Sequence, residues 1–250
     1  MIEKTTLKNA QEIMFDILVE VDRICQKHKI EYWLDSGTLL GAVRHQGFIP
    51  WDDDLDIVMK IEDYDKFCKV APEELSNGFF LQNVNIEGSF PYDFTKVRSD
   101  RGKIVEKHED GKTVTYNQGI FIDIFPLIAI KDSFLHRKAY ISNILLIKLF
   151  SYKYLNILSL SRFFVSLSHK FHQGWDKEKS LVVYAGNFPF LPFKIDKESI
   201  FPLKKRLFCD KEFPIPHDED KYLKALYGDS YMQLPPKNQR KTHAAHIEVY

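Results

Sequence analysis

A run of carboxylates stands between a glycine turn and an apolar stretch in residues 32–67, YWLDSGTLLGAVRHQGFIPWDDDLDIVMKIEDYDKF. Asp52, Asp53 and Asp54 are followed by Leu55 and Asp56. On an extended strand, side chains two positions apart project from the same face, so Asp54 and Asp56 would point together. Paired carboxylates repel each other unless a cation lies between them, and hard oxygen ligands suit Mg²⁺ or Mn²⁺. The spacing therefore predicts a divalent-metal site on Asp54 and Asp56.

A candidate phosphate cradle lies upstream at Ser36, Gly37 and Thr38. Their backbone N–H groups and hydroxyls suit phosphate oxygens, and Gly37 permits a close approach. The alternative interpretation of the nearby aspartates is an acidic turn whose first Asp caps a helix or strand end. A one-residue shift of strand register would bring Asp53 to the metal face and turn Asp54 away, so the sequence leaves the role of Asp53 open.

Asp123 is a third candidate, because it stands alone in the apolar run FIDIF at 121–125. An ionised carboxylate there is costly unless it meets a cation or a set of hydrogen-bond donors. The alternative is an Asp that caps a turn before Pro126, although its neighbours strongly favour a strand.

Three basic residues are predicted to face phosphate. Arg44 follows the glycine turn, and Lys96 and Arg98 alternate to one face of the predicted strand at 92–98. Solvated charge at a strand edge is the alternative for all three. His45 fits a structural hydrogen-bonding role as well as that of a base.

Three stretches of the chain resemble the LicD family, the phosphocholine-transferase branch of the nucleotidyltransferase-fold superfamily to which fukutin-like proteins also belong. They are SGTLLGAVRHQGFIPWDDDLDI followed by DYDKF, within 36–67, then GIFIDIFPL at 119–127, and LYGDSYMQLPPKNQR at 226–240. The resemblance thus touches the first half and the last quarter of the chain, and residues 131–175 match no motif.

The resemblance implies an α/β (α+β) nucleotidyltransferase-like fold with a mixed sheet flanked by helices. In such folds two carboxylates on one strand and a third on a neighbouring strand bind divalent metal, and Asp54, Asp56 and Asp123 stand at the matching positions. It further implies an enzyme that transfers phosphocholine from CDP-choline to a hydroxyl of a cell-surface glycan or lipid-linked glycan, of teichoic acid, lipopolysaccharide or capsule type. CMP would leave, and Asp123 would also accept the proton of the acceptor hydroxyl.

Other functions stay open at this point. One is transfer of a different phosphate-linked group, or nucleotidyl transfer to a small molecule. More distant is a metal-dependent sugar transferase, since such enzymes also use an Asp-x-Asp pair. A non-catalytic scaffold is the last, although three intact candidate ligands argue against it.

Composition excludes several classes. The balance of 35 basic and 35 acidic residues gives no general attraction to nucleic acid. Cys25, Cys68 and Cys209 are widely spaced, which indicates neither a disulfide framework nor a zinc knuckle and favours the cytoplasm. The charged N-terminus is not typical of a signal peptide. A length of 250 residues predicts one domain, with 131–175 as a helical insertion.

The elements that must position the candidates follow from hydrophobic spacing and turn residues. We expect a helix at 8–28, a short strand from Tyr32, a short helix capped by Ser36 and Gly37, a strand at 55–59, and a helix at 62–71 ended by Pro72. Further strands are expected at 79–84, 92–98, 103–106, 113–116 and 119–125, with turns at Gly88, Gly102 and Gly111.

Residues 133–170 change in character. They read as helical, rich in Leu, Ile and Phe, and contain six basic and no acidic residues, namely Arg137, Lys138, Lys148, Lys153, Arg162 and Lys170. Their uncharged runs are too short for a transmembrane helix. One interpretation is a helical pair packed on the sheet with a solvated basic rim. The other is a basic amphipathic surface resting on anionic lipid at the inner face of the membrane.

The last quarter predicts strand-like pieces in FPLKKRLFCDKEFPIP and a helix at 219–226 that ends at Gly228. The tail after Pro236 is expected to be loop-like. His243 and His246 would face one way on a helix, but a polar tail without a role in binding is the prediction. The YGD motif at 227–229 is expected to shape the site rather than to take part in the chemistry.

Overall fold

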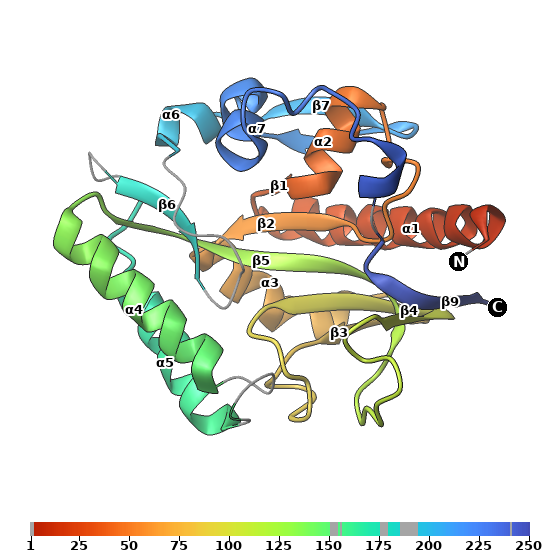
Figure 1. Cartoon of the computed structure of the whole chain (residues 1–250), viewed down its shortest axis with the longest axis horizontal. Coiled ribbons are helices and arrows are strands. Elements are labelled where there is room, and N and C mark those ends of the chain that lie inside the picture. Colours follow the sequence, from red (N-terminus) through yellow and green to blue (C-terminus); the bar gives the residue numbers. More distant parts are fainter. Residues whose placement is uncertain (1–2, 151–154, 156, 176–179, 186–194, 241) are drawn as a thin grey trace.

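The computed structural model describes residues 3–150, 155, 157–175, 180–185, 195–240 and 242–250. Its centre is a seven-stranded mixed sheet in the order β1-β2-β5-β4-β3, in which β6 also pairs with β5 and β9 with β4 (Figure 1). β2 and β5 are parallel, whereas the other pairs of this sheet are antiparallel. The strands are β1 (Tyr32–Leu34), β2 (Asp56–Lys60), β3 (Phe79–Gln82), β4 (Thr95–Glu106), β5 (Gly119–Lys131), β6 (Ser180–Tyr184) and β9 (Ala244–Val249). The predicted fold class is confirmed.

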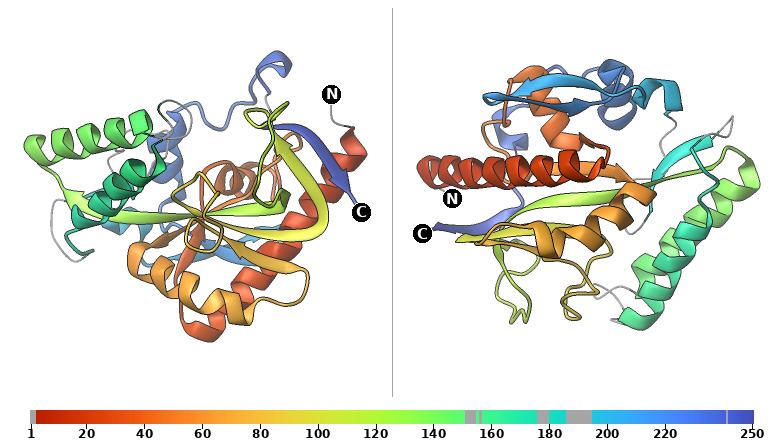
Figure 2. Two further views of the ribbon diagram at one scale, coloured as in Figure 1. Left: turned by 90° about the horizontal axis from the view of Figure 1, so that it is seen from below. Right: turned by 180° about the vertical axis from the view of Figure 1, so that it is seen from behind.

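Helices flank this sheet. α1 (Lys4–His28) and α3 (Ile61–Glu74) lie on one of its faces (Figure 2). Beside β1 lies a second group of elements, made of α2 (Ser36–Arg44), α6 (Lys197–Ile200), α7 (Glu219–Tyr227) and the hairpin of β7 (Lys204–Phe208) and β8 (Lys211–Ile215). A short 3₁₀ helix, Lys237–Gln239, follows α7.

The core forms where the sequence pattern places apolar residues. Along α1 the predicted stripe of Ile13, Ile17, Val21 and Ile24 is buried. β5 is buried along its whole length except at Lys131, because strands pair on both of its edges. A carboxylate on β5 therefore lies in the middle of the sheet, where solvation is poor.

α4 (Phe134–Phe150) and α5 (Leu158–Lys170) form the predicted helical pair. Lys153 lies outside the described residues. Ile144 and Ile147 of α4 belong to the same hydrophobic cluster as the sheet. The assignment of the chain to one domain with an insertion at 131–175 stays a prediction. Within the described residues, every helix is too short or too polar to cross a bilayer.

Two local predictions in the first half are wrong. α3 continues through Pro72 to Glu74, since the proline falls in the last turn, where it removes a single helical hydrogen bond and only two helical residues follow it. Residues 113–116 are not a strand, because β4 beyond Gly102 pairs with β9 and β5 begins only at Gly119. The two strands expected at 92–98 and 103–106 are one, β4, with an irregularity where the turn at Gly102 was predicted.

The tail also differs from its prediction. The helix ending at Gly228 is confirmed, with a backbone φ of 80° at that glycine. Beyond Pro236, however, the chain re-enters the sheet as β9 along the edge of β4. At Gly102 an added Cβ would lie 2.4 Å from the Glu248 carbonyl oxygen, so the glycine permits this close approach. His243 and His246 therefore lie at a strand, not on a helix.

Candidate active site

Asp56 and Asp123 meet across the parallel strands β2 and β5. Asp56 is the first residue of β2, and its register partner is Asp123. Registered residues on neighbouring strands project from the same face about 5 Å apart. Each is only 8% exposed. Burial, followed by the charges of Asp54 and Asp123, holds the pKa of Asp56 well above its usual range.

Asp54 joins this pair from outside the strand. β2 begins at Asp56, so the expectation that both lie on one extended strand is wrong in detail. The charge of Asp54 nevertheless raises the pKa of both Asp56 and Asp123, which shows that it faces the pair. The structure thus brings the three predicted carboxylates together, and their mutual repulsion in a poorly solvated place is what a divalent cation would relieve.

Asp53 has a different position from its neighbours. It is 2% exposed and accepts hydrogen bonds from the backbone N–H groups of His243, at 2.8 Å, and Ala244. It therefore anchors the start of β9. The register in which Asp53 takes the place of Asp54 beside Asp56 and Asp123 is not the one observed.

The predicted cradle at 36–38 is the N-terminus of α2. Asp35, rather than Ser36 or Gly37, occupies the N-cap position. The Thr38 hydroxyl accepts the N–H of Asp56 at 2.8 Å, and Ser36 donates its hydroxyl hydrogen to Asp35. An added Cβ at Gly37 would lie 2.7 Å from Asp52 Oδ2. The hydroxyls thus serve the protein itself, and the first N–H groups of the helix are the donors that suit phosphate.

Asp35 was not identified as a candidate from the sequence. It is fully buried, accepts hydrogen bonds from the hydroxyls of Tyr184 and Tyr222, and donates its N–H to the Asp56 carbonyl at 3.1 Å. Burial raises the pKa of Asp35, although these hydroxyls partly offset the effect. Asp35 therefore ties α2 to β2, and its only sequence signal is its place between a strand and a glycine turn.

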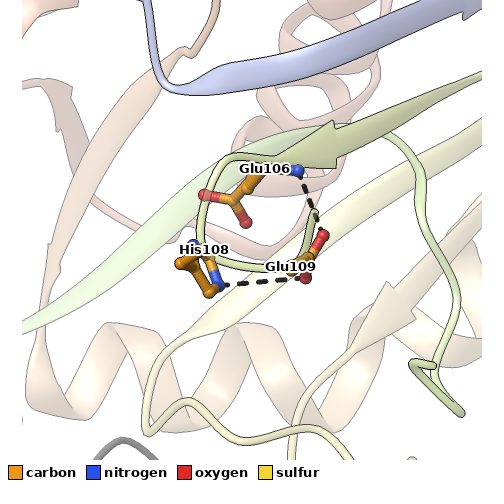
Figure 3. Close-up of side chains that lie close together, drawn as sticks. All are labelled: Glu106, His108 and Glu109. Atoms are coloured by element: carbon orange, nitrogen blue, oxygen red, sulfur yellow. Dashed lines mark hydrogen bonds and ion pairs between the residues drawn. The ribbon is translucent and has the colours of Figure 1, made fainter. Parts of the chain in front are cut away.

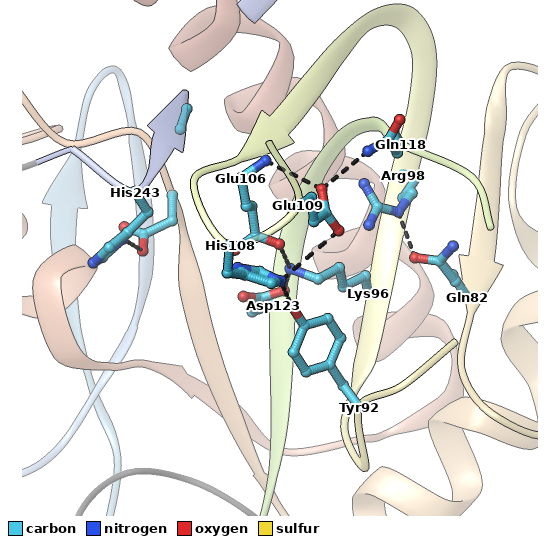
Figure 4. Close-up of polar contacts among 12 residues, drawn as sticks. Gln82, Tyr92, Lys96, Arg98, Glu106, His108, Glu109, Gln118, Asp123 and His243 are labelled. Carbon is cyan, nitrogen blue, oxygen red and sulfur yellow. Dashed lines mark hydrogen bonds and ion pairs between the residues drawn. The ribbon is translucent and has the colours of Figure 1, made fainter. Parts of the chain in front are cut away.

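Lys96 and Arg98 point to one face of β4, as predicted, and both lie over the ring of Phe121. Lys96 Nζ is 2.8 Å from Asp123 Oδ1 and 3.8 Å from Glu106 Oε2 (Figure 4). Burial is the main cause that raises the pKa of Asp123 to about 6, and Lys96 opposes it. Lys96 is therefore the fixed positive partner of Asp123.

Arg98 was predicted to face phosphate, and its position in the structure corrects this prediction. It is 1% exposed and donates to Gln82 Oε1 and, at 2.6 Å, to the Gly119 carbonyl. The enclosed guanidinium therefore links β4 to β3 and β5 and does not reach a substrate. Arg44 donates to the carbonyl oxygens of Tyr231 and Gln233, so it holds the segment after α7. Contact of Arg44 with a phosphate stays a prediction.

His243 is the residue that the sequence interpretation set aside and the structure brings to the site. Its Nδ1 lies 2.8 Å from Asp54 Oδ2. The contact with Asp54 raises the pKa of His243 to about 9. His246, by contrast, is directed to Glu248 at the exposed edge of β9. Tyr227 also lies near the carboxylates, since the charges of Asp35 and Asp56 add to burial in raising its pKa.

A second group of acidic side chains lies at the C-terminal end of β4. Ligand atoms of Glu106, His108 and Glu109 fall within 4.8 Å of one another (Figure 3). Glu109 already accepts hydrogen bonds from Tyr116, from Gln118 and from the backbone of Glu106. Because the Glu109 carboxylate is already engaged in these hydrogen bonds, this group suits a metal less well than the aspartates do.

Comparisons with known proteins place the chain in a family. The model of the LicD/FKTN/FKRP nucleotidyltransferase domain matches residues 29–163. The chain is 26% identical to the lipopolysaccharide cholinephosphotransferase LicD of Haemophilus influenzae over 98% of both chains. It is 53% identical to human ribitol 5-phosphate transferase FKRP over 24% of this chain and 13% of FKRP. A further relative, the uncharacterized protein RT0683 of Rickettsia typhi, is 41% identical over 29% of this chain and 24% of its own length.

Proposed function

Because the chain belongs to the LicD family of nucleotidyltransferase-fold proteins, we propose that it is a phosphotransferase that moves phosphocholine from CDP-choline to a hydroxyl of a cell-surface glycan precursor. The observation that carries the proposal is the cross-strand pair Asp56 and Asp123 with Asp54 beside it. The similarity to the cholinephosphotransferase along nearly the whole chain supports choline as the transferred group.

In this proposal Asp54, Asp56 and Asp123 hold Mg²⁺ or Mn²⁺. When bound, the cation neutralises the charge that develops on the phosphate oxygens. The N-terminus of α2 binds donor phosphate through its backbone N–H groups, and Arg44 approaches from the other end of this helix.

The transfer exchanges one phosphorus–oxygen bond for another. The acceptor hydroxyl oxygen bonds to the choline-bearing phosphorus, the bond from that phosphorus to the bridging oxygen breaks, and CMP leaves. Asp123 takes the hydroxyl proton as the general base. Lys96 orients Asp123 for this transfer through their 2.8 Å contact.

The proposed partners and location follow from the same chemistry. The acceptor is a glycan or a lipid-linked glycan of teichoic acid, lipopolysaccharide or capsule type. Nucleic acid is not a proposed partner, because the net charge is zero. We place the protein in the cytoplasm, in keeping with the free thiols of Cys25, Cys68 and Cys209.

The test is incubation with CDP-choline, Mg²⁺ and acceptor glycolipids while CMP release is followed. Asp123→Asn should slow the release at least ~100-fold while donor binding persists, and Asp100→Asn, an exposed aspartate on β4, is the matched control. Full activity of Asp123→Asn would remove Asp123 from the reaction.

A second candidate is transfer of a different phosphate-linked group, which the local similarity to ribitol 5-phosphate transferase FKRP favours. Product analysis with CDP-ribitol in place of CDP-choline separates the two. Turnover of UDP-sugars that does not require Asp123 would indicate a sugar transferase. Absence of turnover with every donor would indicate a non-catalytic scaffold.

A further inference from the structure

The helical pair α4 and α5 has one face in the core and one face in solvent. Tyr140, Ile144 and Ile147 of α4 are buried against the rest of the protein. The pair projects from the end of β5, at the edge of the molecule (Figures 1 and 2). Its inner face accordingly accounts for the apolar stripe that any packed helix needs. The outer face has no such explanation.

That outer face is apolar as well. Of the fourteen large apolar side chains that are exposed in the described residues, six lie on these two helices, namely Phe134, Leu135, Leu145, Leu149, Leu160 and Phe163. Phe134 and Leu135 are 74% exposed, and Leu145 and Phe163 are 61% exposed. Clustered exposed apolar side chains of this size are uncommon on a free surface and mark a place of contact.

Charge indicates what this face contacts. Residues 133–170 contain no Asp or Glu and six basic residues, of which Lys153 lies outside the described residues. Lys138 Nζ lies 4.3 Å from the centre of the Phe134 ring, so a cation lies beside one of the exposed aromatic side chains of this face. Arg162 donates to the neutral carbonyl of Gly88, and this contact leaves the positive charge of Arg162 uncompensated. Arg137, by contrast, forms an ion pair with Asp132.

We propose that the outer face of α4 and α5 docks on an anionic phospholipid bilayer. The apolar side chains enter the boundary between headgroups and acyl chains, while the long basic side chains remain among the phosphates. The helices lie in the interface rather than span it, in line with their length and polarity. The proposal is independent of the reaction above, because it needs no property of the carboxylate site.

The experiment is sedimentation of the full chain with vesicles of phosphatidylglycerol and phosphatidylcholine, compared with pure phosphatidylcholine, at low and at high salt. We expect binding to the anionic vesicles that is at least ~5-fold tighter than to the neutral ones and weaker at high salt. Failure to bind anionic vesicles at both salt concentrations would overturn the proposal.

Variants identify the surface. Leu145→Asp combined with Phe163→Asp should weaken binding at least ~10-fold, since two apolar side chains are lost and two negative charges are added. Leu207→Asp on β7 is the matched control, because Leu207 is 40% exposed and lies among the elements beside β1. Circular dichroism verifies that all variants fold.

Two results would contradict the assignment. Equal loss of vesicle binding in the Leu207 variant would show a non-specific effect of added charge. A dimer by light scattering that the double variant dissociates, without vesicle binding by the parent chain, would identify a second copy of the chain as the occupant of this face.

Discussion

Asp53 and Asp56 carry the same type of side chain three positions apart, but they have opposite roles in the folded protein. Asp53 accepts two backbone N–H groups and fixes the start of β9. Asp56 faces other carboxylates, so its negative charge destabilises the folded state. The pKa of Asp56 is raised on folding, which means that its ionised form weakens the folded state at neutral pH.

Opposite effects on stability follow from this difference. In metal-free buffer, Asp56→Asn should leave the free energy of unfolding level or raise it, because a repelling charge is removed. Burial raises the pKa of Asp53 as well, but each of its two oxygens accepts a backbone N–H, from His243 and Ala244. Asp53→Asn should therefore lower the free energy of unfolding by roughly 1–2 kcal/mol, because the amide NH₂ would face one of these N–H groups and leave it unsatisfied. Thermal unfolding with a chelator measures both, and titration with Mn²⁺ should show weaker binding to Asp56→Asn only. A larger loss for Asp56→Asn than for Asp53→Asn would make Asp56 a structural residue.

The sequence indicated candidate site residues where carboxylates stand in an unusual local context, among apolar residues or next to other carboxylates. Asp123 among apolar residues and the spacing of Asp54 and Asp56 were sufficient to select the three carboxylates that the fold gathers. His243 and Asp35 were missed because their partners are distant in the sequence. Arg98 was misassigned because alternation predicts the face on which a side chain lies, but not whether another strand covers that face.

At the scale of elements, α2 is held by a close approach of backbone to backbone. An added Cβ at Gly41 would lie 2.4 Å from the Gly47 carbonyl oxygen. This approach folds the chain after α2 back toward the carboxylate run, and neither backbone segment can move without shifting the site.

Gly41→Ala should therefore lower the free energy of unfolding by roughly 1–3 kcal/mol, the usual cost of overpacking, and also reduce activity. Gly88→Ala is the control, since a Cβ there meets no atom within 4 Å. Chemical denaturation of the two variants compares them. Equal stability of Gly41→Ala and the parent would show that α2 can shift freely.

Glu20 joins α1 to the chain that leaves α3. Glu20 accepts from Arg23 and, at 2.8 Å, from both the N–H and the hydroxyl of Ser76. The hydrogen bond from Arg23 is the main cause that lowers the pKa of Glu20 from 4.5 to about 2.

The pH dependence follows from the sign of this shift. A lowered folded pKa means that Glu20 contributes its full stability above pH 4.5 and loses it as the pH falls through about 2. Glu20→Gln should cost roughly 1–3 kcal/mol at pH 7, and the difference from the parent should shrink between pH 4.5 and 2. Urea denaturation across this range measures it, with the exposed Glu12→Gln as control. A pH-independent difference would contradict the assignment.

Local sequence signals predicted the elements well where propensity and burial agree, as in α1, β2 and α7. They failed for β9, in which only Ile247 and Val249 of the six residues AAHIEV favour a strand. Its strand conformation comes from the exposed edge of β4 and from Asp53, which are both distant in sequence. Pairing partners, rather than local pattern, decided this element.

At the scale of the whole molecule, β9 closes the edge of β4 and brings His243 to Asp54. Removal of residues 242–250 should therefore lower the melting temperature by several degrees and abolish CMP release, although most of the carboxylate site lies far away in the sequence. Removal of Tyr250 alone, which is 77% exposed, is the control. A tail-deleted chain with normal melting and turnover would show that β9 is dispensable.

The register of β2 and β5 also bears on biosynthesis. Asp56 and Asp123 meet only across a parallel strand pair, and the whole of β3 and β4 lies between them in the chain. A parallel pair forms only after the intervening polypeptide has crossed over, and such long-range contacts arise late. A nascent chain that ends before β5 therefore lacks the paired carboxylates, so the proposed divalent ion can bind only after the sheet has assembled and does not guide its assembly.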